Sequence, residues 1–241
     1  MSEPVSVIVN VFNEAATIED EIRAIHAGIV AKLPGSEFIV AEDGSTDGTK
    51  EIITRLVGEL GVIHLTSVER KGYARALGDA LAAARNPWIF FSDTGGKNDF
   101  ADFWKLYEAR HGAGLVVGYR SGRTDSPYRR LLTAIYNRVL RLYFGVPVRD
   151  ADCGFRLYDA ALARDVAAQT WINRDLIASE LVIRLNAMGA VIREVPVTYR
   201  QRHGASRGLP SRRIPKVVLR VLGNMARLKR ECAELAQRHT V

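Results

Sequence analysis

Residues 38–47, Phe-Ile-Val-Ala-Glu-Asp-Gly-Ser-Thr-Asp, decide the fold class of this chain. A short apolar run ends there in two acids, a glycine and two hydroxyl residues, which is typical of a buried strand followed by a polar turning loop. In open α/β sheets, ligands bind beyond the carboxyl ends of the strands. The stretch therefore predicts a strand end that faces a polar ligand.

The same arrangement occurs at two other places. The largely apolar run 5–11 continues into Phe-Asn-Glu at 12–14, and the run 88–91 continues into Ser-Asp-Thr-Gly at 92–95. Each of the three strand ends carries a carboxylate. Because parallel strands end at the same edge of a sheet, we expect the three ends to converge on one polar ligand.

The first half of the chain alternates between strand and helix patterns. Strands are predicted at 4–11, 37–41, 62–66, 88–92 and 114–118, and helices at 17–32, 48–59, 73–85 and 99–110. This alternation is typical of a mostly parallel sheet covered by helices. The predicted fold class is therefore α/β.

The second half is less regular. Helices are predicted at 128–144 and 175–188 and a strand at 190–199, and residues 200–213 form a loop that holds five arginines. Residues 214–238 have the pattern of a basic amphipathic helix. We therefore divide the chain into a domain over 1–210 and a C-terminal basic helix over 211–241, which packs on the domain or lies on a membrane surface.

The charge and the cysteines limit the possible partners and compartments. A formal net charge of +7 suits phosphates of nucleotides, lipid head groups or nucleic acid, although it is also compatible with a merely solvated basic surface. Cys153 and Cys232 have no metal-like spacing and favour a reducing compartment. We see no signal peptide and no run of about 18 uncharged apolar residues. The expected location is cytoplasmic, with peripheral attachment to the inner face of the membrane as a further expectation.

Several classes of protein lose support. The chain has neither the Walker pattern nor the dinucleotide fingerprint, and its five histidines suggest no Ser-His-Asp site. A sugar nucleotidyltransferase would need a glycine-rich basic loop near residues 10–20, which is absent. Without a helix-turn-helix signal or a basic patch interleaved with aromatic residues, nucleic acid is not an expected partner.

The ordered set of motifs resembles a known family. Residues 7–14 (VIVNVFNE), 42–49 (EDGSTDGT) and 91–93 (FSD) look like the family 2 nucleotide-sugar glycosyltransferases. Residues 152–158 (DCGFRLY) and 194–206, from EVPVTY to the GAS at 204–206, resemble the dolichol-phosphate mannose synthase branch, whose members are polyprenyl-phosphate glycosyltransferases. The resemblance covers about residues 4–207.

The resemblance implies a GT-A-like three-layer sandwich with a mostly parallel central sheet. It implies an inverting, hexosyltransferase-type enzyme that moves a sugar from a nucleoside diphosphate sugar to a polyprenyl phosphate. Transfer to a glycan or small-molecule hydroxyl, and a donor-binding member with degraded activity, remain alternatives.

The resemblance also assigns the donor site. Asp43 matches the contact to base or ribose, and Phe12 and Glu14 flank the base. The donor or nucleotide contacts that it implies are Val11, Phe12, Glu14, Asp43, Lys71, Gly72, Arg75, Asp93, Thr94 and Lys97. Asp43 is alternatively a turn or helix-capping acid, Phe12 and Glu14 can serve ordinary packing and capping, and Arg75 can be a solvated helix residue.

The metal site of the family is altered in this chain. Asp93 is present, but Gly95 stands where the family usually has a second acid, and Lys97 stands where this branch often has a glutamine. A divalent Mg²⁺ or Mn²⁺ prefers several oxygen ligands, so a metal on Asp93 is doubtful. The Lys97 ammonium can instead neutralise the diphosphate. The alternative is a solvated Lys97, with Asp93, phosphate and water holding the ion.

Residues of the second half are implied at the acceptor side. Asp152, with Asp93, is the catalytic candidate. A hydroxyl acceptor needs a general base, whereas a lipid phosphate does not, and Asp152 can equally be an acid bound to backbone N–H groups before Gly154. The candidates for an anionic acceptor or the leaving diphosphate are Arg156, Arg202, Ser206 and Arg207, with Gly204 in the same loop. Each arginine can alternatively be a surface residue.

Both long basic helices are candidates for contact with an anionic membrane. For 128–144 we favour packing against the domain with a charged outer face, and for 214–238 both alternatives stay open.

Overall fold

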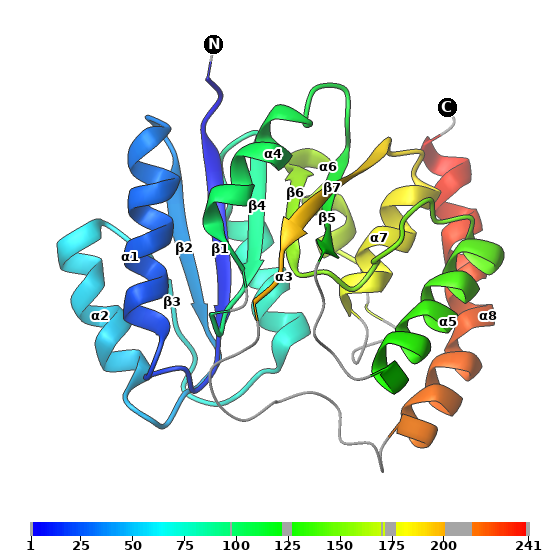
Figure 1. Ribbon diagram of the computed structural model, residues 1–241, viewed down its shortest axis with the longest axis horizontal. Coiled ribbons are helices and arrows are strands. Elements are labelled where there is room, and N and C mark those ends of the chain that lie inside the picture. Colours follow the sequence, from blue (N-terminus) through cyan, green and yellow to red (C-terminus); the bar gives the residue numbers. More distant parts are fainter. Residues whose placement is uncertain are drawn as a thin grey trace.

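A seven-stranded sheet lies between two layers of helices (Figure 1). The computed structural model describes residues 2–96, 98–121, 127–169, 171, 177–200 and 214–239. The strands are β1 (Val5–Val11), β2 (Glu37–Glu42), β3 (Ile63–Leu65), β4 (Trp88–Asp93), β5 (Leu115–Ser121), β6 (Phe155–Asp159) and β7 (Ile192–Thr198). Their order across the sheet is β3-β2-β1-β4-β6-β5-β7.

The helices are α1 (Ile18–Gly28), α2 (Thr49–Leu60), α3 (Tyr73–Ala83), α4 (Phe103–Glu108), α5 (Pro127–Phe144), α6 (Ala160–Ala167), α7 (Ile177–Ala187) and α8 (Ile214–His239). Two short 3-10 turns, η1 (Val30–Lys32) and η2 (Phe100–Asp102), accompany them. Helices α1 and α2 pack together on one face of the sheet, and α3 and α6 pack together on the other. The predicted three-layer α/β sandwich with a mostly parallel central sheet is confirmed.

The register of the parallel strands brings the predicted strand ends together. Asn10 in β1 lies opposite Ala41 in β2 and opposite Asp93 in β4, so the three strands end at one level. All seven residues of β1 are buried, as expected for a parallel strand covered by helices on both faces. The edge formed by these strand ends is where the candidate site lies.

One strand of the sheet was not predicted. β6 runs antiparallel to both β4 and β5, and α6 follows it directly. Asp159 caps α6 by accepting hydrogen bonds from the backbone N–H groups of Ala161 and Leu162. The apolar pattern of β6 is interrupted by Arg156, which is nonetheless buried. Because a charged residue interrupts the apolar pattern of this short strand, periodicity in the sequence does not predict the strand.

The helix ends were predicted less well than the helices themselves. The helix predicted over 17–32 ends at Gly28 and is followed by the separate turn η1, and the helix predicted over 99–110 is divided into η2 and α4. Both differences lie at helix termini, where hydrogen bonds from tertiary neighbours compete with the regular pattern.

Helix α8 packs on the domain through its C-terminal half. Met225, Leu228, Cys232 and Leu235 recur at helical spacing and are buried. Arg184 of α7, which is 1% exposed, donates to Glu231 of α8 at 2.9 Å. No helix among the described residues combines the length and the apolar character needed to cross a bilayer.

We predict that Leu228→Ala lowers the free energy of unfolding by about 2–5 kcal/mol, because it removes buried methyl groups and leaves a cavity. Leu222→Ala on the same helix is the matched control, since Leu222 is 53% exposed, and we expect a change within about 0.5 kcal/mol. Urea denaturation followed by circular dichroism measures both. Equal effects of the two substitutions would contradict the packing of this half of α8.

Candidate active site

The loops that follow β1 and β2 are joined by the hydroxyl residues of the sequence motif. Ser45 Oγ accepts a hydrogen bond from the backbone N–H of Asn13 at 2.9 Å, and Asn13 Oδ1 accepts one from the N–H of Thr46 at 2.9 Å. Thr49 Oγ1 accepts from the N–H of Glu14 at 2.9 Å. The hydroxyl residues Ser45 and Thr49 of the 42–49 motif therefore hold the two loops together.

Asp43, which follows β2, is hydrogen-bonded to the loop that leads into α3. Its Oδ1 accepts hydrogen bonds from the backbone N–H groups of Lys71 at 2.7 Å and Gly72 at 3.1 Å. Its own N–H donates to the carbonyl of the buried Val11 at 2.9 Å. The N–H groups of Lys71 and Gly72 precede Tyr73, the first residue of α3, so Asp43 holds the loop before the helix and does not cap the helix itself. A carboxylate with about four acceptor positions can still accept from a ligand.

A cation stacked on an aromatic ring lies next to Asp43. The Arg70 guanidinium carbon is 4.0 Å from the centroid of the Phe12 ring, and Arg70 Nε is 3.8 Å from Asp43 Oδ2. Gly44 makes the close approach of the two loops possible, because a Cβ there would lie 2.7 Å from the backbone N of Arg70. The sequence analysis did not select Arg70, because its partners come from other strand ends.

The two cations predicted on α3 are differently placed. The Lys71 ammonium pairs with Asp79 at 2.7 Å, so only its backbone reaches Asp43. Arg75 is exposed on the helix, which matches its alternative as a solvated residue. Gly72 has a φ of +93° at the start of α3, a conformation that favours glycine.

The end of β4 touches the loop that precedes β6. The backbone N–H of Asp93 donates to the carbonyl of Gly154 at 2.8 Å, and the Tyr73 hydroxyl donates to Asp93 Oδ1 at 3.2 Å. A Cβ at residue 154 would overlap the Asp93 carboxylate. Gly154 is thus required for the loop that holds Asp152 to lie against Asp93.

Asp152 has the most perturbed carboxyl group of this edge. Its side chain is open to solvent, but desolvation by the surrounding protein raises its pKa to about 6. The positive charges of Arg120 and Arg156 oppose the shift, and the negative charges of Asp93 and Asp150 add to it. A carboxyl group with a raised pKa next to other acids is a common feature of functional sites.

A glutamate of α1 holds the loop that follows Asp93. The backbone N–H groups of Gly95 and Gly96 donate to Glu21 Oε1 at 2.8 and 2.7 Å. Burial raises the pKa of Glu21. Thr94 is buried, and its hydroxyl donates to the carbonyl of Asn10 at 3.2 Å. The loop is therefore directed toward α1, and sequence reasoning missed Glu21 because it is 74 residues away from Gly95.

The described residues fit a divalent metal poorly. They include no group of three or more His, Cys, Asp or Glu side chains that could hold an ion. Gly95 has no side chain that could coordinate a metal, and its backbone N–H donates a hydrogen bond to Glu21. Lys97 lies outside the described residues. Asp93 alone does not supply the oxygen set that Mg²⁺ or Mn²⁺ prefers.

The placement of Arg156 corrects one prediction. Its side chain is 1% exposed and donates to the backbone carbonyls of Ala151, Cys153 and Ala178. The guanidinium is used inside the protein, where it holds the loop before β6, and is not placed to contact an acceptor or a diphosphate. Arg202, Gly204, Ser206 and Arg207, the other predicted acceptor residues, lie outside the described part of the chain.

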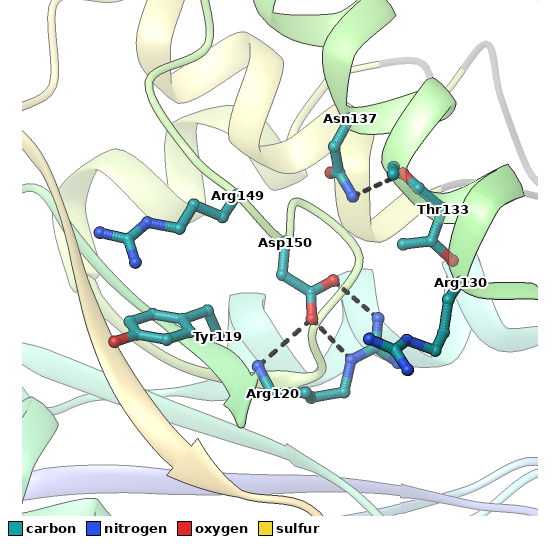
Figure 2. Close-up of a pocket in the computed structure, with 8 residues that line it drawn as sticks. Tyr119, Arg120, Arg130, Thr133, Asn137, Arg149 and Asp150 are labelled. Carbon is teal, nitrogen blue, oxygen red and sulfur yellow. Dashed lines mark hydrogen bonds and ion pairs between the residues drawn. The ribbon is translucent and has the colours of Figure 1, made fainter. Parts of the chain in front are cut away.

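An open pocket of about 210 Å³ lies between the end of β5 and α5. Its lining residues are Tyr119, Arg120, Arg130, Thr133, Ala134, Asn137, Arg149 and Asp150. Figure 2 shows Arg120 and Asp150 between Arg149 on one side and the α5 residues on the other.

Three arginines make this pocket basic. Arg120 forms a two-point ion pair with Asp150, with both distances 2.6 Å. Arg149 stacks on Tyr119 at 4.7 Å from the ring centroid and also lies 3.5 Å from Glu194 Oε2. Arg130 makes no ion pair with any described residue, so it is the cation of the pocket that the described carboxylates leave uncompensated. The sequence analysis missed the pocket; the spacing of Arg130, Thr133 and Asn137 on one helix face is the signal that would have shown part of it.

Comparison with known proteins identifies the family of this chain. The family model described as glycosyl transferase family 2 matches residues 6–166. Glycosyltransferase AglD of Haloferax volcanii is 33% identical over 217 residues, which are 81% of this chain and 33% of that protein. Dodecaprenyl-phosphate galacturonate synthase of Rhizobium johnstonii is 27% identical over 227 residues, which are 91% of this chain and 66% of that protein.

The chain thus spans about a third to two thirds of the length of these two relatives. Among solved structures, glucosyl-3-phosphoglycerate synthase of Mycobacterium tuberculosis, in complex with Mn²⁺, UDP and glucosyl-3-phosphoglycerate, superposes with a TM-score of 0.68 at 19% identity. The match covers 93% of this chain and 80% of that one. At this identity the likeness establishes the fold.

We predict that Asp152→Asn makes the protein more stable at about pH 8 than the parent, and that the difference disappears near pH 4. An ordinary aspartate has a pKa of about 3.9 when unfolded, and Asp152 has a raised pKa of about 6 when folded. Between these values the folded state binds more protons, so the parent loses stability as the pH rises through the window. Thermal unfolding of both proteins across this range measures the effect, and a pH-independent difference would contradict it.

Proposed function

Since the chain belongs to glycosyl transferase family 2, we propose that it transfers a sugar, with inversion, from a nucleoside diphosphate sugar to a polyprenyl phosphate. The observation that carries the acceptor class is the basic pocket beside the loop of Asp152. The named relative from Rhizobium johnstonii supports the same class.

The donor is proposed to lie across the ends of β1, β2 and β4. Phe12 and Arg70 offer a flat surface against which a base can stack. Asp43 and Glu14 supply oxygen acceptors for base or ribose, with Val11 and Thr94 forming the floor between them. This arrangement directs the diphosphate toward Asp93. The predicted cations Lys97, Arg202 and Arg207 lie outside the described residues.

The chemical step needs little from the protein beyond position. A phosphate oxygen of the acceptor forms a bond to the anomeric carbon as the bond from that carbon to the diphosphate breaks, and the nucleoside diphosphate leaves with the electron pair. A lipid phosphate is already anionic and needs no general base. Asp93 and Asp152 accept hydrogen bonds from sugar hydroxyls and so hold the anomeric carbon in line.

The state of Asp152 favours one alternative acceptor. With a pKa of about 6, this carboxyl group is ionised at neutral pH and is basic enough to take a proton from a hydroxyl. A glycan hydroxyl is therefore the second candidate acceptor. The basic pocket favours the lipid phosphate over the glycan hydroxyl, because a neutral hydroxyl would not form ion pairs with Arg130 and Arg149.

No step of the proposed mechanism depends on a metal ion. Mn²⁺ accompanies UDP in the superposed Mycobacterium tuberculosis structure, but the described residues of this chain include no group of three or more His, Cys, Asp or Glu side chains that could hold an ion. A metal, when bound, would supply positive charge to the diphosphate. We derive no step through it and expect the chain's own cations to carry part of that charge.

We predict that Asp43→Ala weakens nucleotide-sugar binding by roughly ten- to a hundredfold, because the substitution removes a charge-assisted hydrogen bond to the nucleotide. Calorimetric titration with UDP-, GDP- and dTDP-sugars, each in Mn²⁺ and in EDTA, measures the affinity and its metal dependence. Asp43→Asn is the matched variant, since its Oδ1 can still accept from Lys71 and Gly72. Absence of binding by the parent under every condition would reject the proposed function.

We predict that Arg130→Ala raises the KM for a short-chain polyprenyl phosphate by about tenfold or more, while the donor affinity stays unchanged. Arg138→Ala is the control, because Arg138 is an exposed arginine of the same helix outside the pocket lining. Initial rates at saturating donor measure both variants. Transfer to a soluble glycan by the parent, with none to polyprenyl phosphate, would establish the hydroxyl acceptor instead.

A further inference from the structure

Helix α1 carries a glutamate on its buried face. Glu21 is 7% exposed and shares this face with Ile18, Ile22 and Ile25. No lysine or arginine among the described residues forms an ion pair with its carboxylate. Burying a carboxylate without a cation costs free energy unless hydrogen bonds compensate it. The groups that donate to Glu21 therefore decide why it lies there.

The place of Glu21 in the helix does not by itself explain the burial. Acids in the first turn of a helix are favoured by the helix dipole, and Glu19 and Asp20 of the same turn already supply this charge. Glu19 lies at the surface, where it pairs with Arg23 and Arg55. Since an acid needed only for the helix could lie at the surface as well, the buried carboxylate serves a contact outside α1.

That contact is the loop that follows β4. The backbone N–H groups of Gly95 and Gly96 both donate to Glu21 Oε1, at 2.8 and 2.7 Å. The two glycines have φ values of +99° and +67°. Successive N–H groups that converge on one anion form a concave site for negative charge. The Glu21 carboxylate occupies this site from within the protein.

The same contact explains why position 95 has no side chain. The φ of +99° at Gly95 is favourable for glycine and strained for a residue with a Cβ. An acid at this position would have to leave the conformation in which the loop donates to Glu21. Glu21 and Gly95 thus form one arrangement, in which a carboxylate reaches the loop from α1 and none projects from position 95.

The remaining described contacts of this loop are with the strand ends. The Thr94 hydroxyl donates to the carbonyl of Asn10, the sixth residue of β1, at 3.2 Å. Further along the chain, Asn98 Nδ2 donates to Ser92 Oγ at 3.0 Å and to the carbonyl of Asp93 at 3.3 Å. The described residues of the loop are therefore held by β1, β4 and α1, and Glu21 supplies the contact to α1.

We propose that Glu21 is a positioning residue for the donor diphosphate, because it holds the loop after Asp93 in the conformation that receives the phosphates. The inference rests on the proposed function, in which the base lies at Phe12 and Asp43, beside β1 and β2. β4 lies on the opposite side of β1 from β2, so its loop is on the side toward which the diphosphate and sugar extend. Glu21 is buried behind the loop and acts through the backbone, without touching the donor.

The test compares a nucleoside diphosphate with the monophosphate of the same base, since the pair differs by one phosphate. Calorimetric titration with UDP and UMP, and with GDP and GMP, gives the affinity ratio for the base that the parent binds. Glu21→Ala should weaken diphosphate binding by about tenfold or more and leave monophosphate binding within about twofold of the parent. A general loss of folded protein would weaken both nucleotides alike, so the ratio separates positioning from stability.

The titrations are made in EDTA and again in Mn²⁺. We expect the same selective loss in both, because Glu21 acts on the loop through two N–H groups and not through an ion. Glu21→Gln keeps an oxygen that can accept from both N–H groups, and it should retain the affinity ratio of the parent.

Two further variants complete the set. Gly95→Ala leaves the carboxylate in place but disfavours the φ of +99°, and it should reproduce the selective loss even where Glu21→Ala does not fold. Asp20→Ala is the matched control, because Asp20 is an exposed acid of the same helical turn. This control should bind both nucleotides like the parent.

Three outcomes would overturn the inference while the proposed function stands, because the parent would still bind the diphosphate. The first is a parent-like affinity ratio in both Glu21→Ala and Gly95→Ala. The second is tighter diphosphate binding by Glu21→Ala, since the carboxylate would then compete with phosphate for the N–H groups. The third is a loss confined to Mn²⁺. A parent that binds neither UDP nor GDP would instead reject the proposed function, and the inference with it.

Discussion

Parallel pairing of β1 with both of its neighbours sets the position of every other part of the site. Asn10 lies opposite Ala41 and opposite Asp93, so three strands end at one level and their following residues meet at one edge. β1 is buried throughout, and its backbone groups must therefore be paired within the sheet. A shift of one residue in either pairing would turn the side chains of a strand to the opposite face and disperse the site.

This convergence concentrates negative charge, and the protein compensates the acids unequally. Asp43 is held by two backbone N–H groups, and Asp150 by the guanidinium of Arg120. Asp152 has less compensation from neighbouring positive charge. Its pKa is raised because desolvation by the protein destabilises the carboxylate more than Arg120 and Arg156 stabilise it. A sugar that brings hydroxyl donors to this edge would complete the set of hydrogen bonds, so the imbalance is itself a feature of a binding site.

Helix α5 connects this edge with the outer surface of the molecule. Arg130, Thr133 and Asn137 line the basic pocket, while Leu131 and Ile135 are exposed on the outward face. The helical repeat of 3.6 residues allows one short segment to serve two environments. An acceptor with an anionic head and a long apolar chain presents the same two chemistries, so the pocket and the exposed apolar residues of this single helix agree with one class of substrate.

The sequence by itself determined the α/β class and the edge at which β1, β2 and β4 end, because apolar runs that end in acids report burial and strand ends locally. Asp43, Asp93 and Asp152 stay predictions as the acids of the site. Only the tertiary structure decided that Arg156 works inside the protein and that the chain contains β6, since backbone carbonyls of separate segments compensate a charge that sequence reasoning places on the surface. It also decided the link from Glu21 to the Gly95 loop and the basic pocket. These groups are brought together by the packing of helices on the sheet, and no periodicity within one segment encodes such a contact.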